Sequence, residues 1–401
     1  MKKTLCMLLA VVMVIGMLAG CGSSNSGNTN EPATNQPAAE NPTGEAAPAA
    51  FKIGGTGPLT GGAAIYGIAA ANGAKIAVDE INEAMGYTFF ELRYEDDAHD
   101  AEKAVNAYNA LKDWGMQISL GSVTSTPCAA TAAETYSDRI FALTPSASAP
   151  AVIQGRDNMF QMCFLDFPTQ GGASAQYIYG MDPNTKVGII WKNDEDYSTG
   201  LRNSFVETAA ELGLEIVEEQ TFTEGNVDFS VQLTAIQNAG ADLVFLPMYY
   251  QPASLIFAQA ASMGYATKWF GVDGMDGILD MEGFDPALAE GVMLLTAFNA
   301  DSDDPAAISF VTKYQAQFGD GINQFAADAY DCVYAYKQAL DAVGATPDMS
   351  AEELCALMIE QFTSMSFDGL TGTGMTWDAT GAVSKGAHGC VIENGAYVGL
   401  D

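Results

Sequence analysis

The feature that most constrains the fold is a strand–helix alternation that runs through residues 51–150 and starts again at residue 186. Short apolar runs alternate with longer segments in which apolar residues recur at helical spacing. This alternation is typical of parallel sheets, because a crossover helix carries the chain back between parallel strands. Two such series predict an α/β fold with two lobes, each a mainly parallel sheet flanked by helices.

The elements can be placed along both series. Strands are expected at 51–55, 88–94, 117–120, 140–143, 186–191, 214–222, 242–247 and 268–272. Helices are expected from Ile65 to Ala84 and at 99–114, 127–137, 198–213, 228–239, 252–264, 305–318, 325–343 and 351–362. In the first helix, Ile65, Ile68, Ala69, Ile76, Ala77, Ile81 and Ala84 are expected to share the inward face. The final segment, 371–401, predicts hairpin-like strands.

The N-terminus predicts export. Lys2 and Lys3 precede an apolar run from Leu5 to Leu18, which is short for a membrane span, so residues 1–20 are interpreted as a signal segment. Residues 22–50 contain no aromatic residue and no Leu, Ile, Val or Met. Residues 21–50 are therefore expected to form a disordered tether.

Composition excludes several classes of partner and site. The formal net charge of −34 over 401 residues disfavours nucleic acid as a partner. No CxxC motif occurs, and we infer no disulfide framework, although whether any of Cys128, Cys163, Cys332, Cys355 and Cys390 pair stays open. The acidic run Asp96, Asp97, His99 and Asp100 allows a metal site, but a helix start rich in acid is favoured. No metal or cofactor is expected.

Polar side chains follow successive strands of both series. In open parallel sheets, ligands bind beyond the carboxyl ends of the strands. The hydroxyl-rich loop Thr144 to Pro150 follows the fourth strand of the first series. The strand-end candidates are Tyr66, Ser125, Ser146 and Ser148 in the first series and Tyr197, Tyr249, Tyr250 and Asp273 in the second. Hydroxyls suit a carboxylate and Asp273 suits an ammonium, so the set suits a zwitterion.

Several motifs together resemble one family. They are Gly57-Pro58-Leu59 through Tyr66-Gly67, Tyr94-Glu95-Asp96-Asp97, Thr144 to Pro150, Gly240-Ala241-Asp242 and Gly372 to Asp378. Over residues 51–400 the chain resembles the branched-chain amino acid binding proteins of ABC importers, which are type I periplasmic binding proteins. The resemblance implies a solute-binding protein that is not an enzyme, uses no cofactor, and delivers an amino acid to a membrane permease.

The resemblance also implies residue roles. Ser125, Ser146 and Ser148 match positions that hold the α-carboxylate and part of the amine, and Asp273 matches an acidic residue that pairs with the ammonium. Tyr66, Tyr197 and Tyr249 match aromatic pocket walls, with Tyr250 open as the alternative to Tyr249. The best-known members carry Glu where Asp273 stands. Some have a disulfide whose cysteines would fall near His99 and at Thr124. Because relatives also bind amides, urea or aromatic acids, these are alternative ligands.

The same resemblance implies the organisation of the chain. The first lobe is expected to comprise 51–166 and 298–373, and the second 167–297 and 374–401. A three-strand hinge is expected to cross near 164–168, 295–300 and 371–376, so that the lobes close on the solute. Leu18-Ala19-Gly20-Cys21 resembles the bacterial lipobox, which implies that Cys21 is lipidated and anchors an extracytoplasmic protein. A monomer is the default expectation.

The main rival is a nicotinamide-dependent oxidoreductase. The loop Thr56 to Gly62 partly resembles the TGxxxGxG motif of short-chain dehydrogenases, and Tyr108 and Lys112 supply a YxxxK spacing. However, Ala63 replaces the last glycine and Tyr108 comes too early in the chain. A hydrolase is disfavoured because the sequence has only two histidines and no GxSxG motif.

Overall fold

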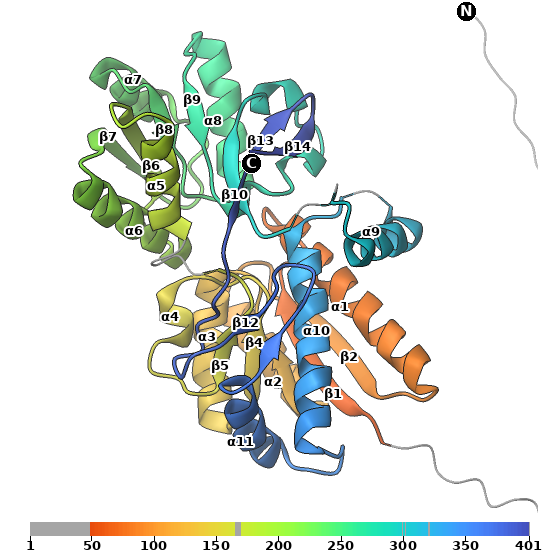
Figure 1. Cartoon of the computed structure of the whole chain (residues 1–401). Coiled ribbons are helices and arrows are strands. Elements are labelled where there is room, and N and C mark those ends of the chain that lie inside the picture. The colour runs from red at the N-terminus through yellow and green to blue at the C-terminus, as the bar shows by residue number, and fades with distance from the viewer. Residues whose placement is uncertain (1–48, 165–169, 299, 301, 320, 401) are drawn as a thin grey trace, which may run out of the picture. The chain divides into compact units, whose positions relative to one another are not determined.

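The computed structural model describes residues 49–164, 170–298, 300, 302–319 and 321–400. The expected signal segment, Cys21 and nearly all of the tether lie outside the described residues, as does most of the expected crossing at 164–168. The described chain contains one five-stranded sheet, one seven-stranded sheet and one two-stranded sheet (Figure 1). Two α/β lobes are therefore present, as the alternation predicted.

The first sheet is entirely parallel. Its order is β2-β1-β3-β4-β5, formed by β1 (Phe51–Gly57), β2 (Phe90–Asp96), β3 (Ile118–Leu120), β4 (Phe141–Thr144) and β5 (Met159–Gln161). The strand order reverses between β1 and β3, and a doubly wound sheet offers its ligand crevice at such a switch point. Strand β5 was not expected from the sequence.

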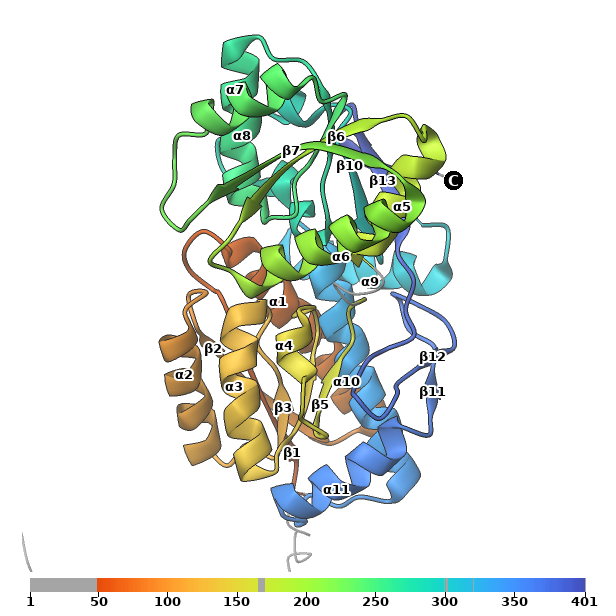
Figure 2. The ribbon, with the colours of Figure 1, turned by 90° about the vertical axis from the view of Figure 1, so that its left-hand side faces the viewer.

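Helices cover both faces of the first sheet (Figure 2). One face packs against α1 (Ala64–Met85), α10 (Gln324–Val343) and α11 (Ala351–Phe362). The other packs against α2 (Ala101–Asp113) and α3 (Ser125–Asp138). Helices α1 and α10 lie in close contact at Gly73, where a Cβ would come within 1.9 Å of the Ala326 carbonyl oxygen. The inward face of α1 was predicted too broadly, since Ile68 and Ala84 are exposed.

The second sheet repeats this order and extends it. Its order is β14-β13-β10-β9-β8-β6-β7, formed by β6 (Lys186–Lys192), β7 (Glu215–Phe222), β8 (Leu243–Phe245), β9 (Lys268–Phe270), β10 (Met293–Thr296), β13 (His388–Glu393) and β14 (Ala396–Gly399). Strands β6 to β10 are parallel, with a switch point between β6 and β8. The expected C-terminal hairpin is β13–β14, added antiparallel to β10.

Alternating side chains of the second sheet face two helix layers. Ile189 packs with the layer of α5 (Gly171–Met181) and α6 (Asp196–Leu212). Ile190 packs with the layer of α7 (Ser230–Ala239) and α8 (Tyr250–Met263). Because successive strand residues point to opposite faces, an apolar run such as β6 belongs in a sheet covered on both sides.

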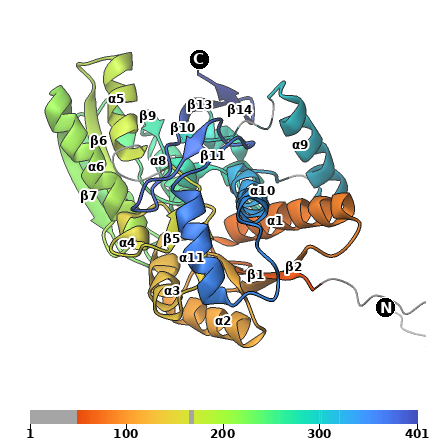
Figure 3. The same ribbon diagram turned by 60° about the horizontal axis from the view of Figure 1, so that its bottom comes forward.

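The remaining elements lie in the connections along the chain between strands of these sheets (Figure 3). They are α4 (Pro150–Ile153), the 3-10 helices η2 (Asp273–Met275), η3 (Ile278–Asp280) and η4 (Pro286–Ala289), α9 (Pro305–Phe318), and the paired strands β11 (Ser366–Phe367) and β12 (Met375–Thr376). Helices α9 and α11 begin and end where the sequence predicted. Asp304 caps α9 by accepting a hydrogen bond from the Ala306 amide at 2.7 Å.

The segment after β12 stays beside the first sheet. The Trp377 indole N–H donates to the Gln161 carbonyl at 2.7 Å, and the Gln161 amide donates to the Gly381 carbonyl at 3.0 Å. The Lys385 ammonium then donates to the Met162 carbonyl at 3.1 Å. We therefore propose that the third crossing follows Lys385, and that the first lobe extends to this residue beyond the expected boundary at 373.

Two further observations concern the described residues alone. None of the helices they form is both long enough and apolar enough to cross a membrane. The thiols of Cys128, Cys332, Cys355 and Cys390 are buried and take part in no disulfide there.

Candidate functional site

The loops at the carboxyl ends of both sheets meet around one small space, which we call the cleft site. It is lined by Tyr66, Val123, Thr124, Ser146, Tyr197, Tyr249, Asp273, Gly274 and Phe325. The space measures about 10 Å³, room for about one water molecule. Five of the strand-end candidates named from the sequence thus border the same space. Ser125 and Ser148, although buried, are not among the lining residues.

Hydroxyl groups hold the loop after β4 in place. The Ser146 hydroxyl donates to the Val123 carbonyl at 2.6 Å, and the Thr144 hydroxyl donates to the Ser122 carbonyl at 2.7 Å. The Thr144 oxygen also accepts from the Ala147 amide at 3.0 Å. These bonds join the loops after β3 and β4, so Ser146 reaches the cleft site from a rigid support.

Ser125 supports the cleft site without lining it. It begins α3, and its hydroxyl oxygen accepts a hydrogen bond from the Ala149 amide at 3.2 Å. Ser148 is fully buried in the same loop. Both serines therefore position the loop that carries Ser146.

Asp273 faces the loop of Ser146 from the second lobe. It begins η2 after β9 and is 3% exposed. The Tyr197 hydroxyl donates to its carboxylate, and its own amide donates to the Gln170 side-chain oxygen at 2.8 Å. Burial raises the pKa of Asp273 to about 6, because the bond from Tyr197 offsets only part of the lost hydration. Asp273 is thus a buried carboxylate ready to accept a cationic donor.

Three tyrosines complete the wall. The Tyr197 and Tyr249 rings stack with centroids 4.5 Å apart and planes 10° apart. The Tyr66 hydroxyl donates to the Gly274 carbonyl and accepts from the Tyr250 amide at 3.1 Å, which joins the two lobes. Tyr249 lines the cleft site, whereas Tyr250 packs edge-on against Tyr66 outside it. The placement therefore favours Tyr249 over Tyr250.

Gly274 sets the spacing of this wall. A Cβ at this position would come within 2.7 Å of the Tyr197 hydroxyl oxygen and 3.0 Å of the Tyr249 ring. Only glycine leaves room for the stacked rings beside η2.

His99 lies beside the cleft site, in contact with Thr124 and Tyr249 of its wall, and was not among the candidates named from the sequence. Its Nδ1 lies 2.9 Å from the Thr124 hydroxyl, its Nε2 lies 3.1 Å from the Glu195 carboxylate, and its ring meets Tyr249 edge-on. His99 follows β2, so the strand-end argument applied to it as well. It was set aside because the acidic run beside it resembles a helix start, which is also true: Asp100 caps α2.

A larger hollow of about 500 Å³ adjoins the cleft site at Tyr249. It is lined by residues of both lobes, including His99, Lys103, Lys192, Glu195 and Gln251. This polar hollow and the cleft site share Tyr249 in their walls.

The acidic run after β2 supports structure. The Asp96 carboxylate accepts from the Leu59 amide at 2.8 Å and from the Thr60 hydroxyl at 2.6 Å, which fixes the loop after β1. Among the described residues, no group of three or more His, Cys, Asp or Glu is arranged to hold a metal ion.

Comparison with known proteins agrees with this architecture. The sequence profile of a family described as periplasmic binding protein matches residues 50–393. The "Leucine-, isoleucine-, valine-, threonine-, and alanine-binding protein" of Pseudomonas aeruginosa is 27% identical over 323 residues, covering 79% of this chain and 85% of that protein. The leucine-specific-binding protein of Salmonella typhimurium is 28% identical over 294 residues, covering 72% of this chain and 78% of that protein.

Solved structures give the same result. A leucine-binding protein from Thermotoga maritima superimposes with a TM-score of 0.79 at 26% identity, covering 88% of this chain and 98% of that one. A branched-chain amino acid transporter substrate-binding protein from Streptococcus pneumoniae, in complex with isoleucine, superimposes with a TM-score of 0.78 at 27% identity. The match covers 87% of this chain and 98% of that one. The family binds solutes outside the cytoplasm and is not enzymatic. The chain therefore belongs to the periplasmic binding protein family.

Proposed function

We propose that this protein is the solute-binding component of an ABC importer and that its ligand is an amino acid, branched-chain or closely related. The observation that carries the proposal is the pairing of two chemically opposite groups in one space. Ser146 approaches from the first lobe with hydroxyl and amide donors nearby, and Asp273 approaches from the second lobe with a carboxylate.

An amino acid would be held at both ends. Its carboxylate would accept a bond from the Ser146 hydroxyl, which would turn from the Val123 carbonyl to the ligand, in the loop that Ser125 and Ser148 keep in position. Its ammonium would bond to Asp273 and so supply the cation that this buried carboxylate otherwise lacks. Tyr66, Tyr197 and Tyr249 would enclose the side chain.

Binding requires the lobes to move. The space of about 10 Å³ is far smaller than an amino acid, so entry needs a wider cleft. The hinge would open at the crossings near 164–168, at 295–300 and after Lys385. A ligand that contacts both lobes favours the closed form, because only that form makes both sets of contacts. The closed form would then dock on the permease.

The relatives support the ligand class. The proteins named above carry leucine, isoleucine or valine in their names, and one is a complex with isoleucine. Thr124 and the polar hollow beside Tyr249 are consistent with a somewhat wider range of side chains. We propose that the chain acts as a monomer and is held at the membrane by lipid on Cys21.

Asp273→Asn tests the proposal, because it keeps the size of the side chain and removes its charge. Isothermal titration calorimetry with leucine, isoleucine, valine and threonine should show binding to the wild type and roughly a tenfold to hundredfold loss in the variant. Asp276→Asn is the matched control, since Asp276 is equally buried three residues away but does not line the cleft site. Unchanged affinity in Asp273→Asn, or equal losses in both variants, would contradict the role of Asp273.

Membrane attachment is tested separately. Cys21→Ala should move the protein from the membrane fraction to the soluble fraction without changing amino-acid affinity. Persistent membrane association would refute lipidation at Cys21.

A further inference from the structure

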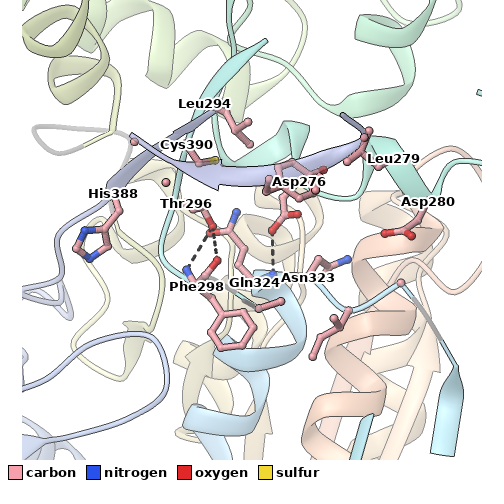
Figure 4. A pocket seen from close by; sticks show the side chains of 18 of the residues that line it. Asp276, Leu279, Asp280, Leu294, Thr296, Phe298, Asn323, Gln324, His388 and Cys390 are labelled. Carbon is pink, nitrogen blue, oxygen red and sulfur yellow. Dashed lines mark hydrogen bonds between the residues drawn. The ribbon is translucent and has the colours of Figure 1, made fainter. Parts of the chain in front are cut away.

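A second cavity lies at the hinge and shares no lining residue with the cleft site. It encloses about 440 Å³ and is bordered by η3, the residues that follow β10, the start of α10 and the β13–β14 hairpin (Figure 4). We call it the rear pocket and define it by Asp276, Leu294, Phe298, Asn323, His388 and Tyr397. Its volume falls in the range of pockets that hold small molecules.

Much of the wall is apolar. Leu279, Leu294, Phe298 and Ile322 contribute side chains from elements that are far apart in the sequence, and Tyr397 adds a ring from the hairpin. Such a wall favours an aliphatic or aromatic group of a ligand, because burying apolar surface on both sides is favourable.

One buried carboxylate faces this space. Asp276 is 6% exposed, and its Oδ2 accepts from the Gln324 amide at 2.9 Å (Figure 4). Burial raises the pKa of Asp276 to about 7, and the nearby carboxylates of Asp280 and Asp273 act in the same direction. Within the described chain, no Lys, Arg or His forms an ion pair with Asp276. The pocket therefore presents a negative group that a bound cation would stabilise.

An unused donor lies beside it. Asn323 is 3% exposed, and its Oδ1 caps α10 by accepting from the Phe325 amide at 3.1 Å. Its Nδ2 has no hydrogen-bond partner among the described residues, although the side chain lines the pocket. A buried donor without a partner costs free energy, and Asn323 Nδ2 is shielded from solvent here, so a ligand oxygen would reach it once the side chain turns toward the pocket.

The pocket offers little to an anion. No Lys or Arg lines it, and its single imidazole, His388, lies on β13. The first amides of α10 are already used, because Gln324 N–H donates to Asp276 and Phe325 N–H donates to Asn323. A carboxylate or phosphate would therefore meet the carboxylates of Asp276 and Asp280 with no Lys or Arg among the described lining residues to offset the repulsion.

We propose that the rear pocket binds a small organic amine that carries an apolar body and a hydroxyl or ether oxygen but no carboxylate. The ammonium bonds to Asp276, the oxygen accepts from Asn323 Nδ2, and the apolar body packs against Leu294 and Phe298. Asp280, an exposed carboxylate at the edge of the same pocket, adds attraction for a cation. The strongly negative chain favours the approach of such a ligand.

The probe for this site is leucinol, which has an ammonium, a hydroxyl and a branched apolar body. Calorimetry on the full chain at pH 8 should show binding of leucinol, weaker binding of isopentylamine, which leaves Asn323 without an acceptor, and no binding of 4-methylpentanoate. Asp276→Asn should lower the affinity for leucinol roughly tenfold or more. Ala396→Phe should also abolish binding, because this exposed position borders the pocket and the larger side chain would fill it.

Two matched controls distinguish binding in the rear pocket from a charge effect and from binding in the cleft site. Glu393→Gln removes one charge from the same hairpin outside the pocket and should leave leucinol affinity unchanged, which excludes a general effect of net charge. Asp273→Asn should lower leucinol affinity much less than Asp276→Asn does, which excludes leucinol binding in the cleft site. The proposal is overturned if leucinol does not bind, if 4-methylpentanoate binds equally, or if Asp273→Asn removes binding while Asp276→Asn does not.

Discussion

Asp273 and Asp276 lie in the same turn after β9, three residues apart, and both are almost fully buried. They nevertheless line different cavities: Asp273 begins the 3-10 turn and borders the cleft site, whereas Asp276 follows the turn in an extended conformation and borders the rear pocket. Gln324 stands between them: its backbone amide donates to the Asp276 carboxylate, and its side chain donates to the Asp273 carbonyl at 3.3 Å. The wall behind the cleft site is therefore also the wall of the rear pocket.

A third buried aspartate shows what these two lack. Asp328 on α10 receives a hydrogen bond from the ammonium of Lys385, which is itself 4% exposed and also bonds to the Thr371 hydroxyl at 2.6 Å. Asp328 thus has a buried cation beside it, whereas Asp331 is as deeply buried but accepts bonds from the Leu370 and Thr371 amides and the Thr371 hydroxyl instead. Asp273 and Asp276 also have no cationic partner in the described chain, and they differ from Asp331 in that each lines a cavity that a cationic ligand could enter.

The largest expected effect tests that contrast. Lys385→Met should lower the free energy of unfolding by about 3–5 kcal/mol, because it leaves Asp328 buried and unpaired. Urea denaturation measures this loss. Lys75→Met is the matched control: its partner Asp79 is exposed on α1, and the pair should contribute less than about 0.5 kcal/mol. Similar losses of unfolding free energy in the two variants would mean that the buried Lys385–Asp328 pair contributes no more than the exposed Lys75–Asp79 pair.

Asp276→Asn should act in the opposite direction. The folded pKa of about 7 lies above the value of 3.8 expected for an exposed Asp. The folded state therefore binds more protons between these values, and this group lowers stability as pH rises from about 4 to about 7. A shift of roughly three units corresponds to about 4 kcal/mol. The asparagine keeps the acceptor for Gln324 N–H, so the variant should be more stable by up to this amount at pH 8 and by little at pH 4.

Denaturation of both proteins at pH 4, 6 and 8 measures the difference. Asp273→Asn should follow the same pattern with a smaller gain, because its pKa is raised only to about 6. If the free energy of unfolding of Asp276→Asn differs from that of the wild type by the same amount at all three pH values, Asp276 does not titrate between pH 4 and pH 8.

Ser146→Ala should produce a smaller effect, on amino-acid affinity. Losing one hydroxyl while the loop amides remain should weaken binding by about 1–1.5 kcal/mol, or roughly fivefold to tenfold. Ser148→Ala should weaken binding less, because Ser148 supports the loop without lining the cleft site. Calorimetry with leucine distinguishes the two, and a larger loss in Ser148→Ala would mean that the loop rearranges when ligand binds.

The sequence predicted several elements whose hydrophobic pattern extends over many residues. The apolar runs of β1 and β6 and the periodic helices α9 and α11 are unambiguous over many residues. Strands β5 and β10 and the turns η2 to η4 were missed, and they are only three or four residues long. Helix α5, 11 residues long, was missed as well, and it begins with two glycines, which are poor helix formers. Ile68 was wrongly placed on the inward face of α1. Helical spacing shows where the apolar stripe of a helix lies, but it does not show how much of that stripe the neighbouring elements cover.

The cleft candidates were predictable for a different reason. The rule that ligands bind beyond strand ends selects residues by position in a repeating pattern, and it selected Tyr66, Ser146 and Asp273 before any contact was known. The rear pocket follows no such pattern. Its lining joins a 3-10 turn, a helix cap and a hairpin, so Asp276 and Asn323 become neighbours only after the chain has folded.

The smallest expected effect concerns the two adjacent tyrosines. Tyr249 stacks on Tyr197 and lines the cleft site, so Tyr249→Leu should weaken amino-acid binding by about 0.5–1.5 kcal/mol through loss of the ring pair. Tyr250→Leu should leave affinity within about twofold and lower stability instead, because the Tyr250 ring packs against Tyr66 outside the cleft site. Calorimetry and urea denaturation of both variants separate the two roles. If affinity depends on Tyr250 and not on Tyr249, the ligand does not occupy the space between Ser146 and Asp273, and the assignment of Asp273 to the ammonium would have to be abandoned with it.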